Sequence, residues 1–366
     1  TISFLNHSYS KIIMTQYTDL DPFNHGIATV KYEKMPTAES SRLATILKEG
    51  WGRDEVDILR LSAGAEKNSN NFRVETKSGV YLLKHSHINK PEVQDVVNRA
   101  VAYLKDNGIK TPTVIPTTKG TTFDVTDEGV FCFYDFIEGE NFDGSQSELS
   151  NVAAEIGKFH KILATIPYEA EIKRFNDSIF AHNREELVRI IKAVKEHGEQ
   201  TVFDSYVLGI LDEVDELSQV IVEAKVDHLP SQIVHYDLHP HNVLFNGSSK
   251  ELLALLDFDP LRYSQRARDV GFGMHRFART CGAKTERKND VSVDIRDRAR
   301  LFLDSYVAEN ELTNEEIKVL PLAIQDEAMR RVMIVLGNHY LRNDTTWSFD
   351  LPKQVTTLRE GGFFSF

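Results

Sequence analysis

Short runs of alternating apolar and polar residues dominate the early part of the chain. Residues 57–74 hold apolar segments on both sides of a small polar loop at 62–71, and a Lys-Ser-Gly turn then leads into the apolar run 80–84. Further short apolar runs separated by turn-forming residues occur at 113–136. This spacing predicts strands joined by loops and turns in this part of the chain.

In other segments, apolar residues recur every three or four positions, which is the spacing of an amphipathic helix. One such segment follows Pro91, which suits the first turn of a helix, and ends at an Asn-Gly pair. Ser150 is a residue type that caps helices, and it predicts a helix that runs to about residue 165. The expected helices are 39–48, 53–60, 91–107, 150–165, 206–221, 291–309 and 314–342.

Length and composition narrow the class of protein. A chain of 366 residues with 41% hydrophobic content can bury a large core, and its length favours two lobes or domains. The net charge of -12 argues against a nucleic-acid partner. Cys132 and Cys281 lie far apart and form no disulfide framework, which fits a reducing compartment. With no apolar run of membrane-spanning length and no signal-peptide pattern, we expect a cytoplasmic protein that does not contact a membrane.

A His-x-Asp-x-x-x-x-Asn loop carries the strongest chemical signal. Its Asp237 and Asn242 come just before two apolar runs, 243–245 and 252–256, which are separated by an Asn-Gly turn signal. The pattern predicts an antiparallel hairpin. Because a hairpin returns the chain to its starting point, we expect Asp257 to lie beside Asn242.

These residue types suit phosphoryl transfer. A carboxylate and an amide oxygen at one junction are hard ligands for Mg²⁺, which takes its remaining ligands from water and phosphate. A second carboxylate, Asp237, can accept the proton of an attacking hydroxyl group. A His-x-Asp or Asp-x-Asp pair alone is common and often structural. The joint pattern is much rarer, and it favours a kinase-type site over coincidence.

The loop at 235–242 and the Leu-Asp-Phe-Asp run at 256–259 resemble the aminoglycoside phosphotransferase and choline kinase superfamily. The resemblance extends over about residues 55–345. It implies an α+β, protein-kinase-like fold with a small antiparallel-sheet lobe and a larger helical lobe. The implied division is an N-terminal extension at 1–35, an N-lobe at 36–138 and a C-lobe at 139–366 with the catalytic loop and an acceptor-binding insertion.

The same resemblance implies roles for individual residues. Asp237 becomes the catalytic base, and the metal ligands become Asn242, Asp257 and Asp259, with Mg²⁺ as the metal and ATP or GTP as the co-substrate. The nucleotide-binding residues become Ser62, Gly64, Asn70, Lys84, Asp135, Phe136 and Ile137. The 62–71 loop lacks a full glycine motif. It is therefore also compatible with an ordinary surface hairpin that has no role in nucleotide binding.

One part of the kinase pattern is missing. Kinases usually carry a glutamate on the helix after the lysine strand, and this glutamate pairs with the lysine. Here the corresponding position holds Val97, which leaves Glu92 and Asp95 as candidates for the partner of Lys84. We expect Glu92. The neighbouring Asn-Arg pair at 98–99 is similar to kinases of N-acetylhexosamines.

The chain after the hairpin distinguishes between kinds of kinase. Asp269 resembles the aspartate that braces the catalytic loop from the next helix, and we expect His235 to anchor that loop rather than react. We expect His160 to be a core residue. The span from Asp257 to Asp269 is too short for the activation segment of a protein kinase. A small-molecule alcohol is therefore the expected acceptor.

The class of acceptor stays open at this stage. A sugar or amino sugar is favoured as the acceptor. The alternative acceptor is an aminoglycoside or an amino alcohol of the choline or homoserine type. The alternative to an enzyme is a non-catalytic nucleotide-binding module. The oligomeric state is a monomer or a homodimer. Acids that would suit a cationic acceptor, or that form a solvated helix face, are Glu185, Glu186, Asp212, Glu213 and Glu216. Side chains that would suit a neutral sugar, or that only pack, are Asn338, His339, Tyr340 and Trp347.

Overall fold

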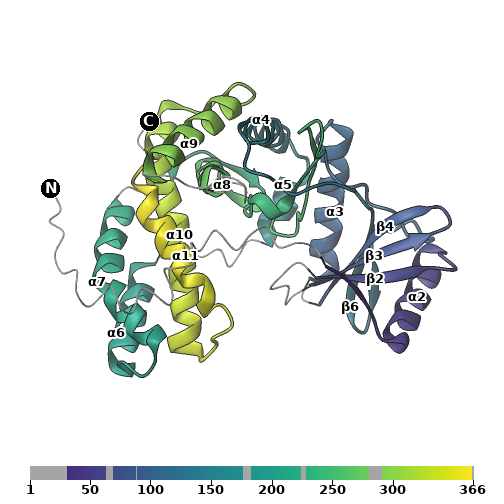
Figure 1. The fold of residues 1–366 in the computed structure, drawn as a ribbon, viewed down its shortest axis with the longest axis horizontal. Helices are drawn as coiled ribbons and strands as arrows, with labels where there is room; N and C mark the ends of the chain where they lie inside the picture. The colour runs from purple at the N-terminus through teal and green to yellow at the C-terminus, as the bar shows by residue number, and fades with distance from the viewer. Residues whose placement is uncertain are drawn as a thin grey trace.

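The computed structural model shows a chain folded into a sheet lobe and a helical lobe (Figure 1). The described residues are 31–62, 69–87, 89–175, 183–223, 228–279 and 291–364. The sheet with helix α2 lies at one end of the molecule, and helices α6, α7, α10 and α11 lie at the other, with α4, α8 and α9 between them (Figure 1). The expected α+β architecture, with a small antiparallel-sheet lobe and a larger helical lobe, is confirmed.

One antiparallel sheet forms the N-lobe. Its strands are β1 (Lys31–Lys34), β2 (Asp57–Ser62), β3 (Ser69–Thr76), β4 (Gly79–Ser86), β5 (Asp124–Thr126) and β6 (Gly129–Asp135), in the order β1-β2-β3-β4-β6-β5. Because β1 pairs with β2, the sheet includes residues that we expected in the N-terminal extension. The register places Lys84 opposite Asn71 and Cys132, in the middle of the sheet.

The period-two pattern of β6 explains how the sheet buries both faces. Phe131 and Phe133 point into the core against α2 (Thr37–Trp51), whereas Val130, Cys132 and Tyr134 form a second cluster on the opposite face. Helix α2 ends at Gly52, which takes a left-handed φ of 64°. The expected helix at 53–60 is therefore wrong, since pairing with β1 and β3 holds residues 57–62 in a strand.

The larger lobe is mainly helical. Its helices are α4 (Gln146–Leu163), α5 (Glu169–Arg174), α6 (Arg184–His197), α7 (Val202–Glu223), α8 (Arg266–Arg279), α9 (Val291–Val307), α10 (Asn314–Arg342) and α11 (Leu351–Gly361). Short strands form two pairs, β7 (Ser231–Val234) with β10 (Arg262–Gln265) and β8 (Val243–Phe245) with β9 (Leu252–Leu255). Helix α4 begins earlier than expected, because Ser145 rather than Ser150 caps it by accepting a hydrogen bond from Glu148 N at 3.3 Å.

Two hydrophobic cores stabilise this lobe. One unites α3 (Pro91–Asp106) of the sheet lobe with α4, α8, α9 and the hairpin β8–β9, so it ties the two lobes together. The other fills the space between α6, α7, α10 and α11. Both cores contact α10, which begins with a capping box between Thr313 and Glu316. No helix within the described ranges has the length and hydropathy to cross a membrane.

Candidate active site

The loop after β7 is held in shape by a buried carboxylate on α8. Asp269 is 2% exposed, and it accepts hydrogen bonds from His235 N at 3.0 Å and Tyr236 N at 2.8 Å. On its other side, the Nε2 atom of His160 lies 3.0 Å from the carboxylate and Nδ1 lies 2.9 Å from the hydroxyl of Tyr306. The expected brace is confirmed, and His160 is the buried core residue that we expected.

His235 ties the loop to the end of the hairpin. Its Nδ1 atom accepts a hydrogen bond from Asp237 N at 3.3 Å, so the proton of a neutral ring lies on Nε2, which donates to Leu256 O at 2.9 Å. The ring is completely buried. His235 therefore anchors the loop backbone, as expected from the sequence.

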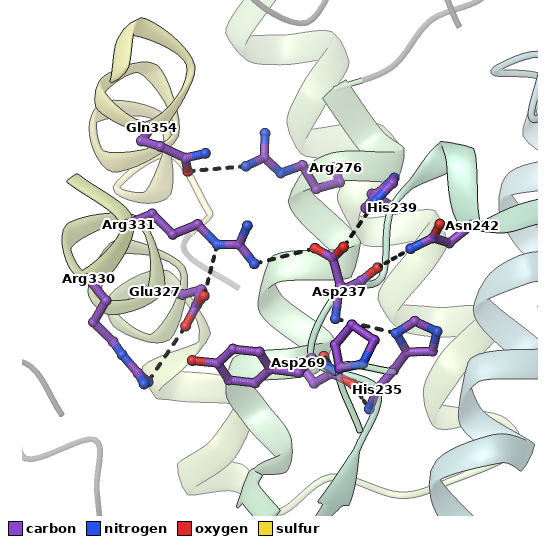
Figure 2. A network of polar contacts seen from close by, with 12 residues as sticks. His235, Asp237, His239, Asn242, Asp269, Arg276, Glu327, Arg330, Arg331 and Gln354 are labelled. Carbon is purple, nitrogen blue, oxygen red and sulfur yellow. Dashed lines mark hydrogen bonds and ion pairs between the residues drawn. The ribbon is translucent and has the colours of Figure 1, made fainter. Parts of the chain in front are cut away.

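The side chain of Asp237 lies between Arg331 and His239 (Figure 2). Its Oδ1 atom is 3.4 Å from Arg331 Nη2, and its Oδ2 atom is 3.3 Å from His239 Nε2. Burial raises the pKa of Asp237, but His239 and Arg331 lower it by more, so that the pKa lies well below the usual value of a carboxyl group. The group is ionised at neutral pH and can accept a hydrogen bond from a hydroxyl group.

The hairpin brings Asn242 and Asp257 together. Leu256 N donates to Asn242 O at 2.9 Å, directly before Asp257, which takes a left-handed φ of 58°. The side-chain nitrogen of Asn242 donates to Asp237 O at 2.9 Å. Because that bond uses the amide nitrogen, the amide oxygen of Asn242 is the atom that can bind a cation.

Lys84 finds its acidic partners in the other lobe. Its ammonium group lies 2.7 Å from Asp257 Oδ1 and 3.0 Å from Asp259 Oδ2. Burial lowers the pKa of Lys84, but the two carboxylates outweigh this effect and raise it above its usual value. Glu92, the expected partner, is exposed in the first turn of α3, so that expectation is wrong.

Neutral amides take the place of the usual helix glutamate. Asn89 Nδ2 donates to Asp259 Oδ2 at 3.0 Å and to Gln94 Oε1 at 2.9 Å. Gln94 in turn donates to Asn98 Oδ1 at 3.1 Å, and Asn98 also accepts from the hydroxyl of Tyr134 at 2.8 Å. This chain of amides connects α3 to the carboxylates around Lys84 without adding a negative charge.

A cavity of about 1100 Å³ lies between the lobes. Of the predicted site residues, its walls contain Lys84, Asp135, Phe136, Ile137, Asn242, Asp257 and Asp259. Asn70 instead makes a 2.8 Å hydrogen bond to His87, while its neighbour Asn71 lines the cavity. Ser62 ends β2, and Gly64 lies outside the described residues.

Residues 135–137, which the family resemblance implies are the hinge between the lobes, offer one backbone donor. Asp135 N donates to Thr113 O at 3.0 Å, and Phe136 N donates to Val80 O at 3.2 Å, so both amides are already bonded within the protein. In the part of the chain that the structure describes, Ile137 N has no protein acceptor. Ile137 therefore carries the hinge N–H group that is available to a ligand in the cavity.

The two sets of residues proposed for the acceptor serve other purposes. Glu186 pairs with Arg189, Glu213 pairs with Arg359, and the other three acids of that set are exposed. Tyr340 donates to Asp204 at 2.7 Å, and His339 lies 2.7 Å from the hydroxyl of Ser348. Contacts within the protein thus hold Glu186, Glu213, His339 and Tyr340, and a role of either set in acceptor binding stays a prediction.

Sequence reasoning missed the arginines that surround Asp237. Arg331 lies on α10, 94 positions further along the chain, and Arg276 lies on α8, close to Gln354 of α11 (Figure 2). No local motif marks either residue. The Arg-Arg pair at 330–331 was the available signal, because both arginines lie within an otherwise apolar helical segment.

Comparisons with known proteins identify the family and the fold of this chain. The sequence model of the phosphotransferase enzyme family matches residues 57–301. A homoserine kinase of Parvibaculum lavamentivorans is 25% identical over 305 residues, which covers 82% of this chain and 86% of that protein. The structure is similar to a spectinomycin phosphotransferase in complex with ADP and spectinomycin, with a TM-score of 0.66 at 16% identity, covering 88% of this chain and 97% of that one. It is also similar to an amicoumacin kinase in complex with AMP-PNP, Ca²⁺ and Ami, with a TM-score of 0.62 at 16% identity, covering 88% of this chain and 92% of that one. These two structural similarities show a shared fold.

Proposed function

Since this chain belongs to the phosphotransferase enzyme family and is a small-molecule kinase, we propose that it moves the γ-phosphate of ATP to an alcohol with Asp237 as the base. The observation that carries the proposal is the position of this ionised carboxylate. Asp237 directly follows Tyr236, whose amide Asp269 holds, and its backbone oxygen accepts a hydrogen bond from Asn242, which lines the inter-lobe cavity.

The reaction needs one proton transfer. Asp237 orients the acceptor hydroxyl and takes its proton while the hydroxyl oxygen attacks the γ-phosphorus. The bond between that phosphorus and the bridging oxygen breaks, and ADP leaves with the bonding electrons. The low pKa of Asp237 keeps the carboxylate ready to accept a hydrogen bond at neutral pH.

The oxygen-bearing side chains at the hairpin fit a divalent cation. Asp257 and Asp259 supply carboxylate oxygens, and Asn242 supplies its amide oxygen, a donor set that suits Mg²⁺. No cluster of three or more His, Cys, Asp or Glu side chains in the described ranges forms a metal site by itself. The set therefore fits a cation that takes its remaining ligands from the phosphates of a nucleotide. When bound, Mg²⁺ supplies charge neutralisation at the β- and γ-phosphate oxygens.

Lys84 and the cavity walls hold the nucleotide in this proposal. Lys84 binds the α- and β-phosphates, and the carboxylates that it contacts align its ammonium group. Ile137 N donates a hydrogen bond to the purine ring of the nucleotide, and Leu82, Val97 and Phe258 are apolar residues of the cavity wall. A role of the loop at 62–71 in covering the phosphates stays a prediction from the sequence, because residues 63–68 lie outside the described ranges. ATP is the proposed phosphate donor and GTP is the alternative. The acceptor screen described below uses both nucleotides and so distinguishes them.

The acceptor is a small molecule with a hydroxyl group. The sequence favoured a sugar or amino sugar. The relative named homoserine kinase supports the amino-alcohol alternative, since it matches most of both chains. A cationic aminoglycoside has less support, because the acidic residues expected to meet it are exposed or already paired.

An acceptor screen with coupled ADP detection tests the proposal. The panel contains sugars, amino sugars, aminoglycosides and amino alcohols, including homoserine, each with ATP and with GTP. We expect turnover of at least one alcohol, and we expect Asp237→Asn to lower kcat by about 10²- to 10⁴-fold. Nucleotide affinity, measured by calorimetry, is the control and stays unchanged, because Asp237 is not a wall residue of the cavity. Full activity in the variant contradicts the role of Asp237, and nucleotide binding without turnover across the panel favours a non-catalytic module.

A further inference from the structure

Positively charged side chains gather beside Asp237, and three helices supply them. Arg276 of α8 and Arg331 of α10 reach toward the same region from opposite sides (Figure 2). Both guanidinium groups lie against the ring of Phe272, with Cζ 4.7 and 4.3 Å from the ring centroid. Arg331 reaches Asp237 Oδ1 at 3.4 Å, so this region adjoins the carboxylate that we propose as the base.

Lys353 of α11 is the third member of the group, which we name the cationic cluster (Arg276, Arg331 and Lys353). Its ammonium group lies 3.7 Å from Asp350, and its side chain is 36% exposed. The nearby Arg276, together with burial, lowers the pKa of Lys353 to about 8. Arg276 also donates to Gln354, the residue next to Lys353, at 3.2 Å, so the two cations lie on adjoining helices.

The carboxylates nearby do not balance these cations. Glu327 lies between Arg331, at 2.9 Å, and Arg330, at 3.6 Å. Arg330 is 2% exposed, and none of its three guanidinium nitrogens makes a hydrogen bond to a described residue. Among the described residues, the cations that influence one another here are Arg262, Arg276, Arg330, Arg331 and Lys353, against the carboxylates Asp237, Glu327 and Asp350. An excess of buried positive charge is unfavourable unless an anion compensates for it.

The cationic cluster lies away from the nucleotide cavity. None of its three residues is among the described residues that line the cavity, whereas Lys84, Asn242 and Asp257 are. Figure 2 shows Asp237 with Asn242 on one side and Arg331 on the other. The cluster therefore lies where the body of the acceptor must lie when its hydroxyl group contacts Asp237.

We propose that the acceptor alcohol carries an anionic oxygen group, a carboxylate or a phosphate ester, which the cationic cluster binds while the hydroxyl group meets Asp237. This inference rests on the proposed kinase function. Guanidinium groups pair with carboxylate and phosphate oxygens through two parallel hydrogen bonds, and such pairs are strong and directional. The same cluster repels a polycationic acceptor.

Matched acceptor pairs test the inference. The pairs are glycerate with glyceramide, gluconate with glucitol, and glycerol phosphate with glycerol, so that carboxylate and phosphate sources are separated. We expect kcat/KM for an anionic member to exceed that of its neutral partner by about tenfold or more, the size of a charge-assisted hydrogen bond. Equal or better use of the neutral members overturns the inference.

Two variants of α11 form a matched set. Lys353→Gln should raise KM about tenfold for the anionic acceptor and change kcat and the KM of the neutral partner by less than about twofold. Arg359→Gln is the control, because Arg359 binds Glu213 at 2.8 and 2.6 Å, on another part of the helix. A loss of kcat with both members of a pair contradicts acceptor binding and assigns the cluster to the transferred phosphoryl group.

A binding experiment separates this inference from the kinase proposal. The protein is saturated with Mg²⁺ and a non-hydrolysable ATP analogue, and each member of the pairs is titrated by calorimetry. If the anionic members bind and Lys353→Gln weakens their binding, the role of the cationic cluster is supported, even if no phosphate is transferred. An absence of turnover in that case counts against the kinase function alone. If no anionic member binds better than its neutral partner, the inference is wrong while the kinase function stands.

Discussion

Replacing Asp269 by asparagine tests whether the buried brace shapes the catalytic loop. The carboxylate accepts hydrogen bonds from two backbone amides, His235 N and Tyr236 N, and contacts His160. The asparagine keeps one acceptor oxygen and turns an amide nitrogen toward a remaining donor. A hydrogen bond to a charged group contributes about 1.5–3 kcal/mol. The free energy of unfolding should therefore fall by about 2–5 kcal/mol.

The same change should affect catalysis through the backbone. Tyr236 has a left-handed φ of 71°, a conformation that costs about 1–3 kcal/mol for a residue other than glycine. Asp269 accepts the hydrogen bond from its amide and so holds it there. Without that bond the loop relaxes and moves the adjacent Asp237. A displacement of about 1 Å costs about 10²-fold in rate, so kcat should fall by about two orders of magnitude.

A matched control separates stability from positioning. Asp204 is another buried carboxylate, which accepts from Gln200 N, Thr201 N and the hydroxyl of Tyr340, but it lies at the start of α7. Urea unfolding and steady-state kinetics are measured for Asp204→Asn and Asp269→Asn. Both should lose stability, and only Asp269→Asn should lose kcat. If the two variants lose stability alike and both keep full kcat, the brace does not position the base.

Three further predictions concern nucleotide binding by Lys84, acceptor binding by Lys353, and helix packing at Gly157. Lys84→Met should lower kcat/KM for ATP by about tenfold or more, while Glu92→Gln should leave it unchanged, because Lys84 pairs with carboxylates of the other lobe and Glu92 is exposed. Because Lys353 has a lowered pKa of about 8 and is charged only below it, kcat/KM for an anionic acceptor should fall as pH rises through about 8, and a pH profile of the Gln variant should lack that decrease. Gly157→Ala should lower the free energy of unfolding by about 1–3 kcal/mol in urea titrations, since its Cβ would lie 2.8 Å from a carbonyl oxygen of α9, whereas Gly209→Ala has open space and should cause no loss.

Local patterns were sufficient for much of the fold and for part of the site. The short apolar runs at 113–136 predicted strands, which the structure contains as β5 and β6, and the run from Asp237 to Asp257 predicted the loop and hairpin that the structure also contains. Two local predictions failed because the sequence pattern was compatible with more than one structure or start point. Residues 57–60 pair with β1 and β3 rather than forming a helix, and Ser145 caps α4 one turn before the expected Ser150.

From the sequence by itself, the resemblance to a known superfamily implied the kinase-like fold, and the local hairpin pattern predicted the close approach of Asn242 to Asp257. Only the tertiary structure decided which charges meet. The ion pair of Lys84 with Asp257 spans 173 positions, and that of Arg331 with Asp237 spans 94. Helix α10 packs against helices on several sides, so its periodicity indicates a helix without revealing that Arg331 faces the catalytic loop. The electrostatic character of the proposed acceptor site follows from such long-range packing.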